Sequence, residues 1–340
     1  MNRPYTHTST KPVGEGLDPP AKPCTTIERR VKTLPYTRGY KERGMYFPLE
    51  MCYTKAEVFI MKLCDLHTHS IFSDGTYTPA QLIDAAIELN LSAIALTDHN
   101  TVDGLPSFLA AAQNKPIEAI PGAEFSVDYN GKELHLLGLY IPESQFSAVS
   151  LLMDIFMERK EQSNRDLIAA LNKAGYDIDF DTIQAATPKG KFNRAHIAGE
   201  LTKKGYTASI KEAFQTLLHP AAGFYKEPER FSLWEMLDFL TDIGAVPVLA
   251  HPFLNLQTRE LETLLPQAKQ RGLVGMECYY SLNDEATTNL SLALAYKNKL
   301  EFSGGSDFHG DRKPDISLGT GHGNLEIPYD WALKLRKPAQ

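Results

Sequence analysis

Two histidines separated by one residue, His67 and His69, follow a short apolar run, and Asp74 comes shortly after them. In a β-strand, residues i and i+2 point to the same face of the sheet, so both imidazoles can reach one ion. Imidazole nitrogens and carboxylate oxygens, without cysteine, suit zinc, manganese or ferrous iron. This spacing predicts a metal site at the end of a strand.

More histidines and carboxylates stand at the ends of later apolar runs. They are His99, Glu124, His135, His251, Asp307 and His309. In a barrel of alternating strands and helices, the loops after the strands meet at one face, so ligands distant in sequence can converge there. Burying this many ionisable groups without metals would be costly. The set therefore predicts a polynuclear metal centre, in which one glutamate that bridges two ions would support hydrolysis at phosphorus.

The composition is that of an ordinary globular protein. The chain has 340 residues, of which 43% are hydrophobic and 23% charged, with a formal net charge of −7. This charge argues against binding of long duplex DNA, whereas a small phosphorylated substrate fits because bound metals would supply positive charge. No apolar stretch approaches the ~20 residues of a membrane span. The 4 cysteines show no CxxC pairing, which favours a reducing cytoplasm over a disulfide scaffold.

Residues 1–60 are rich in proline and threonine and have little apolar periodicity. This is typical of a flexible extension, or of a start codon assigned too far upstream, with Met45, Met51 or Met61 as the true start. The more apolar part, 36–60, could instead pack on the folded domain.

From residue 62 onward, strand-like and helix-like segments alternate. A capping box with proline at the first helical position begins a helix at 78–81, and Asn130-Gly131 marks a hairpin turn. Repeated strand–helix units predict an α/β fold with a parallel sheet, and ligands at several strand ends favour a closed barrel. The alternation breaks over 145–243, where a run of helices is expected. We therefore expect a barrel built from 61–144 and 244–325, and a helical insert that covers the active site.

Six segments resemble the polymerase and histidinol phosphatase (PHP) family. They read DLHTHSIFSDGT, IALTDHNTVDG, IPGAEFS, LHLLGLYI, PVLAHP and FSGGSDFHG. The helical insert, its RAHIAGEL segment and the later GLVGMECYY segment are most similar to the 3′,5′-nucleoside bisphosphate phosphatase and RNase AM subgroup of that family. The resemblance covers about three quarters of the chain, from about 62 to about 319.

The resemblance implies a distorted (β/α)7 barrel with two or three divalent ions, manganese being expected and zinc or iron also fitting. Carried over by position, the first ion would be held by His67, His69, Glu124 and Asp307. The second would be held by Glu124, His135 and His251, and the third by Asp74, His99 and His309. The expected reaction is attack of a metal-bound hydroxide on phosphorus. It would release the 3′-phosphate of a 3′,5′-bisphosphonucleotide, or shorten 5′-phosphorylated RNA from its 5′ end.

A phosphatase also needs cations around the phosphate oxygens, and arginine supplies bidentate hydrogen bonds in the right plane. Arg194 and His196 are the first candidate pair, with His196 as an acid for the leaving group; helix capping or a salt bridge is the structural alternative for Arg194. The subgroup usually has Arg-Pro-His here, and alanine in place of the proline frees the local backbone.

Arg159, Arg165 and Lys226 are further candidates for binding a second phosphate or the base. A solvated helix face explains the two arginines almost equally well. Asp98, beside His99, is expected to orient a ligand or hold its loop rather than bind metal.

Three other functions remain open. A histidinol phosphate phosphatase would use the same barrel and metals. A non-catalytic PHP module of a larger machine is disfavoured by the complete ligand set. An amidohydrolase acting on C–N bonds generally needs a ligating lysine at a strand end, and no lysine of this chain has that setting. The oligomeric state cannot be read from the sequence.

Overall fold

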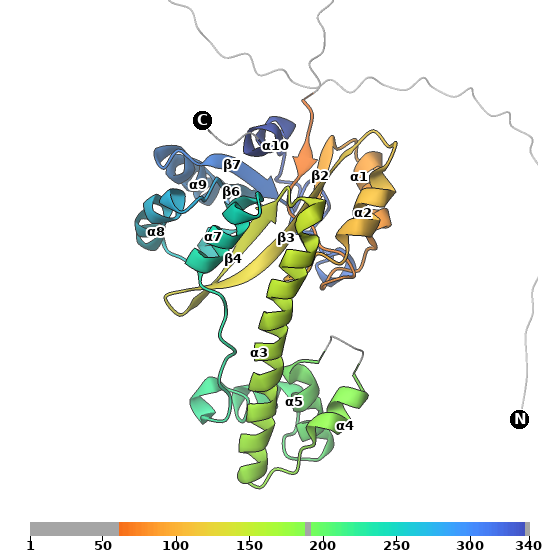
Figure 1. The fold of residues 1–340 in the computed structure, drawn as a ribbon, viewed down its shortest axis with the longest axis vertical. Coiled ribbons are helices and arrows are strands. Elements are labelled where there is room, and N and C mark those ends of the chain that lie inside the picture. The colour runs from red at the N-terminus through yellow and green to blue at the C-terminus, as the bar shows by residue number, and fades with distance from the viewer. Residues whose placement is uncertain (1–60, 188–191, 337–340) are drawn as a thin grey trace, which may run out of the picture. The chain divides into compact units, whose positions relative to one another are not determined.

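The computed structural model describes residues 61–187 and 192–336, so the predictions made for 1–60 lie outside it. Seven strands form one sheet in the order in which they occur in the chain. They are β1 (Cys64–Asp65), β2 (Ala93–Leu96), β3 (Glu118–Tyr129), β4 (Lys132–Leu139), β5 (Val246–Leu249), β6 (Gly275–Tyr280) and β7 (Glu301–Gly305). After β1, the Leu66 N–H donates to the Gly304 carbonyl of β7 at 3.2 Å, which brings the two edges together. The sheet is therefore a nearly closed barrel (Figure 1).

Helices connect the strands. They are α1 (Pro79–Glu88), α2 (Leu105–Ala112), α3 (Phe146–Lys173), α4 (Phe180–Ala185), α5 (Arg194–Lys203), α6 (Ile210–Gln215), α7 (Leu233–Asp242), α8 (Thr258–Gln270), α9 (Glu285–Lys297) and α10 (Tyr329–Arg336). The predicted capping box is confirmed at α1, where Thr78 and Gln81 cap each other's backbone and Pro79 is the first helical residue.

The strands are parallel except around β4, which is antiparallel to both β3 and β5. The reversal follows from the hairpin turn, where Asn130 and Gly131 have φ angles of 55° and 79°. Two consecutive residues in the left-handed region are what a type I′ turn requires. The predicted hairpin is thus confirmed, as is the expected α/β barrel of seven strands, distorted by one reversed strand.

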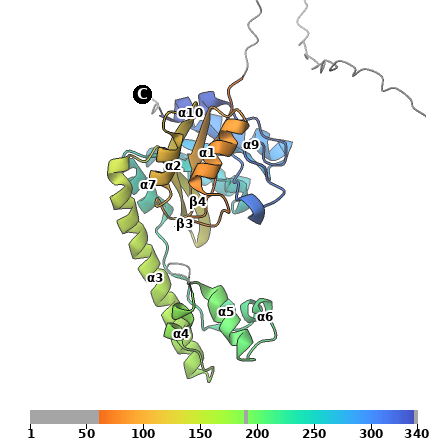
Figure 2. The ribbon, with the colours of Figure 1, turned by 90° about the vertical axis from the view of Figure 1, so that its right-hand side faces the viewer.

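The long helix α3 belongs to two hydrophobic cores. Near its start, Val149 and Met153 are buried in the barrel core, whereas Leu167 and Leu171 near its end are buried in a second core. Figures 1 and 2 show α3 running from the barrel to α4 and α5. A single helix can serve both because its apolar stripe faces a different neighbour in each half.

The second core extends from Leu167 to Tyr225 and contains the buried faces of α4, α5 and α6. Helix α7, in contrast, buries Leu237 and Leu240 in the barrel core. The stretch with its own core is therefore shorter than the insert expected over 145–243, and the boundaries of that insert stay a prediction.

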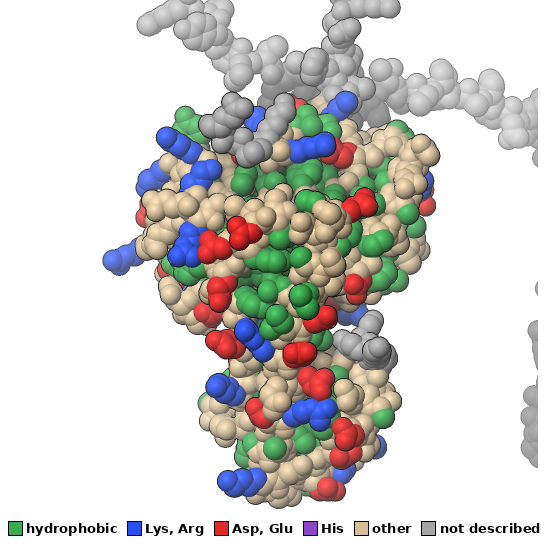
Figure 3. Space-filling view, in the orientation of Figure 1, with side chains coloured by type: hydrophobic (Ala, Val, Ile, Leu, Met, Phe, Trp, Pro, Cys, Tyr) green, Lys and Arg blue, Asp and Glu red, His purple; other side chains and the backbone are tan. Residues whose placement is uncertain are grey.

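No helix among the described residues is both long enough and apolar enough to cross a bilayer. Acidic and basic side chains are interspersed on the face shown in Figure 3.

Candidate metal centre

Nine His, Asp and Glu side chains converge, and they are the nine predicted as metal ligands. Seven of them follow strands, whereas Glu124 lies within β3 and His135 within β4. The groups whose ligand atoms lie within 4.8 Å of one another are His67, His69 and Asp307; His67, Glu124 and His251; His99, Glu124 and His135; and His69, Asp74, His99 and His309. Closure of the barrel is what brings them together, because β1, β3, β5 and β7 are far apart in sequence.

Glu124, on β3, lies at the centre of this cluster and is fully buried. Its Oε1 is 2.7 Å from His135 Nδ1 and 2.9 Å from His251 Nε2. Its Oε2 is 3.3 Å from the Nε2 atoms of both His67 and His69. Each oxygen thus faces a different set of imidazoles, and the predicted bridging of two ions by Glu124 stays a prediction.

His99 lies between two of these groups. Its Nδ1 is 2.9 Å from Glu124 Oε2, and its Nε2 is 3.9 Å from Asp74 Oδ1. Asp74 Oδ1 also lies 3.2 Å from His309 Nε2. The division of the nine residues among three ions therefore stays a prediction, with His99 able to serve either of two positions.

Several buried polar atoms at this place have no hydrogen-bond partner among the described residues. They are His67 Nε2, His69 Nε2, Asp74 Oδ1 and Glu124 Oε2. An unsatisfied buried donor or acceptor costs about 1–3 kcal/mol, so four together are unusual in a folded protein. All four face the interior of the cluster, and nitrogen and oxygen donors of this kind fit divalent zinc, manganese or iron. The residues present therefore fit a metal centre.

The pKa values of groups in the cluster are set by burial and by their charged neighbours. Burial would raise the pKa of Glu124, but the imidazoles of His67, His135 and His99 outweigh it and hold that pKa well below its usual range. Burial would likewise lower the pKa of His135, yet the carboxylates of Glu124 and Glu133 raise it to about 10. The site thus presents negative charge that cations must neutralise, whether these are protons or metal ions.

Two buried aspartates hold the loops that carry the ligands. Asp98 accepts hydrogen bonds from the Ser70 N–H at 2.7 Å and from the Ser73 hydroxyl at 2.6 Å, and thereby fixes the loop before Asp74. Asp65 accepts from the backbone N–H groups of His67 and Ser306 at 3.3 and 2.9 Å. The carboxylate oxygens of both aspartates accept hydrogen bonds from loop backbone and hydroxyl groups instead of facing the cluster.

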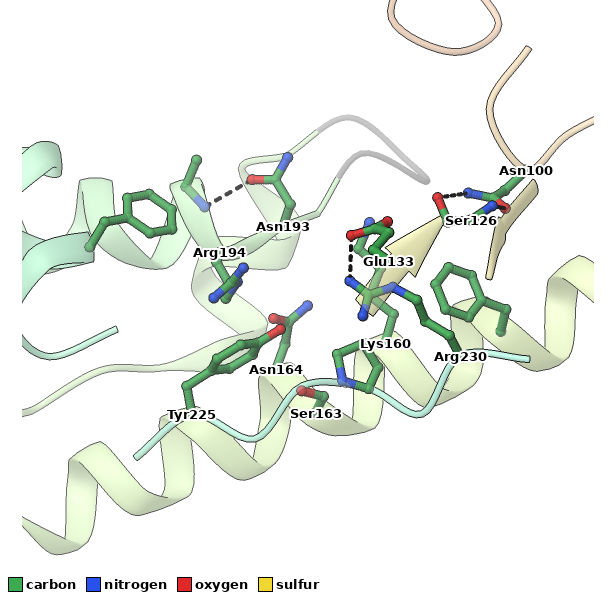
Figure 4. A pocket seen from close by; sticks show the side chains of 14 residues that line it. Asn100, Ser126, Glu133, Lys160, Ser163, Asn164, Asn193, Arg194, Tyr225 and Arg230 are labelled. Atoms are coloured by element: carbon green, nitrogen blue, oxygen red, sulfur yellow. Dashed lines mark hydrogen bonds and ion pairs between the residues drawn. The ribbon is translucent and has the colours of Figure 1, made fainter. Parts of the chain in front are cut away.

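A cavity of about 370 Å³ lies near the metal centre, since Glu133, which lines the cavity, has its Oε1 3.8 Å from His135 Nε2. On the barrel side it is lined by Asn100, next to His99, and by Glu133. On the other side it is lined by Lys160 of α3 and Arg194 of α5, as Figure 4 shows. The volume falls within the range typical of small-molecule sites.

The cations of this cavity are held in place by neighbouring side chains. The Arg194 guanidinium carbon lies 3.8 Å from the centre of the Tyr225 ring, and Arg230 pairs with Glu133 at 2.9 Å. Burial and the nearby charge of Arg194 lower the pKa of Lys160. Positive groups that repel one another in a half-buried cavity favour an anionic ligand.

The other predicted substrate residues lie elsewhere among the described residues. Arg165 pairs with Glu161 at 2.9 Å and covers the Phe180 ring. Arg159 donates to the Glu229 carbonyl at 3.3 Å. Lys226 is exposed. The structure does not bring these three to the cavity, and their role in binding substrate stays a prediction.

His196 takes part in the cap of α5, where its Nδ1 accepts a hydrogen bond from the Asn193 N–H at 3.2 Å. This contact leaves Nε2 as the atom that could donate a proton. The acid role predicted for His196 is untested by these contacts.

Four residues near the site were missed by the sequence reasoning. Glu277 is buried against His67, and its signal was a lone carboxylate in the apolar run GMECYY. Lys160 and Arg230 line the cavity but gave no signal, since each is one charge among many on a polar segment. Lys313 Nζ lies 2.7 Å from Asp307 Oδ2, so a lysine does reach the edge of the centre, although it pairs there with a carboxylate.

The barrel and the cluster at one of its ends define the architecture of a metal-dependent hydrolase. The sequence profile of the PHP domain matches residues 65–243, more than half of the chain, and the chain belongs to this family. The family predicted from the sequence motifs is thereby confirmed.

Individual curated relatives and a solved structure are similar to this chain over most of their length. The 5′-3′ exoribonuclease Rnm of Escherichia coli is 30% identical over 264 residues, covering 75% of this chain and 87% of that protein. The 3′,5′-nucleoside bisphosphate phosphatase of Chromobacterium violaceum is 31% identical over 250 residues, covering 72% and 86%. A solved structure of an amidohydrolase from Chromobacterium violaceum, with bound sulfate and no metal, matches with a TM-score of 0.61 and 27% identity over 82% of this chain and 98% of that one.

The solved structure supports the fold, and the two curated relatives are named for reactions at phosphate esters. The chain is therefore a phosphoric ester hydrolase of the PHP family, as its motifs predicted.

Proposed function

We propose that this enzyme removes the 3′-phosphate of 3′,5′-bisphosphonucleotides and, by the same chemistry, shortens short 5′-phosphorylated RNA. The observation that carries the proposal is the cavity with three cations, Lys160, Arg194 and Arg230, near the metal centre, which it meets through Glu133 and His135. The centre would take the phosphate that is cleaved, and the cavity would take the rest of the nucleotide. The names of the exoribonuclease and phosphatase relatives point to the same two substrates.

The nine clustered residues would hold two or three divalent ions, with manganese expected and zinc or iron alternatives. Such ions would neutralise the charge of the phosphate and make water a stronger nucleophile near neutral pH. Around them, Glu124 would space the ions through its two oxygens. The buried imidazoles would exclude bulk water from the reacting side of the phosphate.

In the cavity, Arg194 is aligned by its stacking on Tyr225 and would form a bidentate contact with the second phosphate. Lys160 and Arg230 would add charge to the same group, and Glu133 would keep Arg230 oriented. His196 would offer its Nε2 to the leaving oxygen, since its Nδ1 accepts from the Asn193 N–H. The metal ions and the cations of the cavity would form two separate positive groups. A substrate with two phosphates thus matches the site better than a monoester does.

The test is release of phosphate from adenosine 3′,5′-bisphosphate by the manganese-loaded protein, with AMP identified by chromatography. Histidinol phosphate is assayed alongside, and His67→Ala serves as the inactive control. Rapid release from the nucleotide, with AMP as product, supports the proposal and leads next to 5′-phosphorylated RNA. Release from histidinol phosphate alone refutes the substrate assignment. An active His67→Ala variant refutes the metal centre.

A further inference from the structure

Glu277 is a fully buried carboxylate on β6 that has no part in the reaction described above. Its two oxygens have different partners. Oε1 lies 3.1 Å from His67 Nδ1, and Oε2 accepts a hydrogen bond from the backbone N–H of His251 at 2.7 Å. His67 follows β1 and His251 follows β5. One side chain therefore links two predicted ligands that come from different parts of the barrel.

The first contact determines which nitrogen of His67 faces the metal centre. Nδ1 points to Glu277, while Nε2 points to Glu124 Oε2 at 3.3 Å. Because a carboxylate can only accept hydrogen bonds, Glu277 favours the tautomer with its proton on Nδ1. That tautomer leaves the lone pair of Nε2 free, which is the form of imidazole that binds a metal ion.

The second contact stabilises an unusual backbone conformation. His251 has φ 23° and ψ 56°, which a residue with a side chain adopts only when its surroundings enforce it. The hydrogen bond from its N–H to Glu277 is one such constraint. In this conformation His251 Nε2 reaches Glu124 Oε1 at 2.9 Å.

We propose that Glu277 is a positioning residue that prepares His67 and His251 together for metal binding. The inference rests on the metal centre of the proposed function, but it does not depend on the substrate. It predicts that the two contacts cannot both survive when the carboxylate becomes an amide. Glutamine has one accepting oxygen, whereas both partners of Glu277 are donors. If the amide NH₂ faces His67, the imidazole must move its proton to Nε2, and that nitrogen can no longer bind metal.

The experiment compares metal binding by wild type, Glu277→Gln and Glu118→Gln. Glu118 is the matched control, because it is a carboxylate at the start of β3 whose oxygens contact Tyr329 and Arg336. Affinity for Zn²⁺ and Mn²⁺ is measured by chelator competition, and urea unfolding of the metal-free proteins is measured in parallel. We expect Glu277→Gln to bind at least one ion roughly 10- to 100-fold more weakly, and Glu118→Gln to bind as wild type.

Unchanged metal affinity in Glu277→Gln, with or without a loss of stability, overturns the proposal and leaves Glu277 as a structural link only. If the variant does not fold, the tautomer of His67 in the zinc-loaded wild type decides the question by long-range ¹H–¹⁵N NMR. A proton on Nδ1 with zinc on Nε2 supports the proposal, and zinc on Nδ1 overturns it. Neither readout uses turnover, so failure of the substrate assignment would not be mistaken for failure of this inference.

Discussion

Replacing Arg194 by alanine should damage binding of the nucleotide far more than it damages the fold. The guanidinium lies 3.8 Å from the centre of the Tyr225 ring and 5.7 Å from that of Phe214, so truncation removes two cation–π contacts, each worth about 0.5–2 kcal/mol. If the proposed contact with a phosphate exists, truncation also removes charge-assisted hydrogen bonds worth about 1.5–3 kcal/mol. That second loss corresponds to a fall in kcat/KM of roughly 10- to 150-fold.

The chain offers a matched control in Arg165→Ala. The Arg165 guanidinium also lies 3.8 Å from an aromatic ring centre, that of Phe180, but Arg165 does not line the cavity. The two variants should therefore lose similar stability in urea unfolding. Only Arg194→Ala should lose kcat/KM.

The assay follows phosphate release from adenosine 3′,5′-bisphosphate and from p-nitrophenyl phosphate. Because p-nitrophenyl phosphate has no second phosphate, Arg194→Ala should be nearly as active as wild type on it. Equal losses of kcat/KM on the bisphosphate in both variants would refute the reasoning, since the effect would then come from the fold. An equal loss on both substrates would instead place Arg194 at the cleaved phosphate.

Three further predictions concern the centre and the barrel around it. Glu124→Gln should lower the bound metal by at least one ion per chain, measured by elemental analysis after dialysis, because Glu124 faces imidazoles with both oxygens; full metal content would contradict its bridging role. Gly305→Ala should destabilise the protein by about 1–3 kcal/mol or more in urea unfolding, because a Cβ at residue 305 would overlap the Cβ of His67. Gly199→Ala is the control: the added atom has nothing within 4 Å and should stabilise the protein by about 0.5–1 kcal/mol. Equal effects of the two glycine substitutions would show that His67 is not packed against β7. In metal-free protein, the melting temperature should fall as pH rises toward 10. Glu124 and Glu133, outweighing burial, raise the pKa of His135 from the usual 6.5 to about 10, so its protonation contributes full stability below pH 6.5, and this contribution declines above 6.5 and is lost as the pH rises through 10. His135→Gln should flatten this profile, and an unchanged slope would assign it to another group.

The sequence by itself determined the family, the barrel and the residue types at the metal centre. These follow from local rules. The capping box at Thr78 and the left-handed turn at Asn130-Gly131 are set by neighbouring residues, and the reversed strand β4 follows from that turn. Histidines and carboxylates at strand ends can be recognised as candidate ligands from the sequence, because a barrel brings the ends of its strands together on one face.

Only the tertiary structure decided how those residues face one another and what supports them. Glu124 meets imidazoles from four other segments because the sheet closes, which no local pattern specifies. Lys160 and Arg194 line the same cavity, whereas Arg159 and Arg165 do not. One residue along a helix rotates a side chain by about 100°, so Arg159 points away from the direction of Lys160. Only the packing of α3 fixes which of its faces meets the cavity. Glu277 also could not be assigned from the sequence, which shows only a lone glutamate in an apolar strand. Its two partners follow β1 and β5, and only the folded chain brings them to its two oxygens.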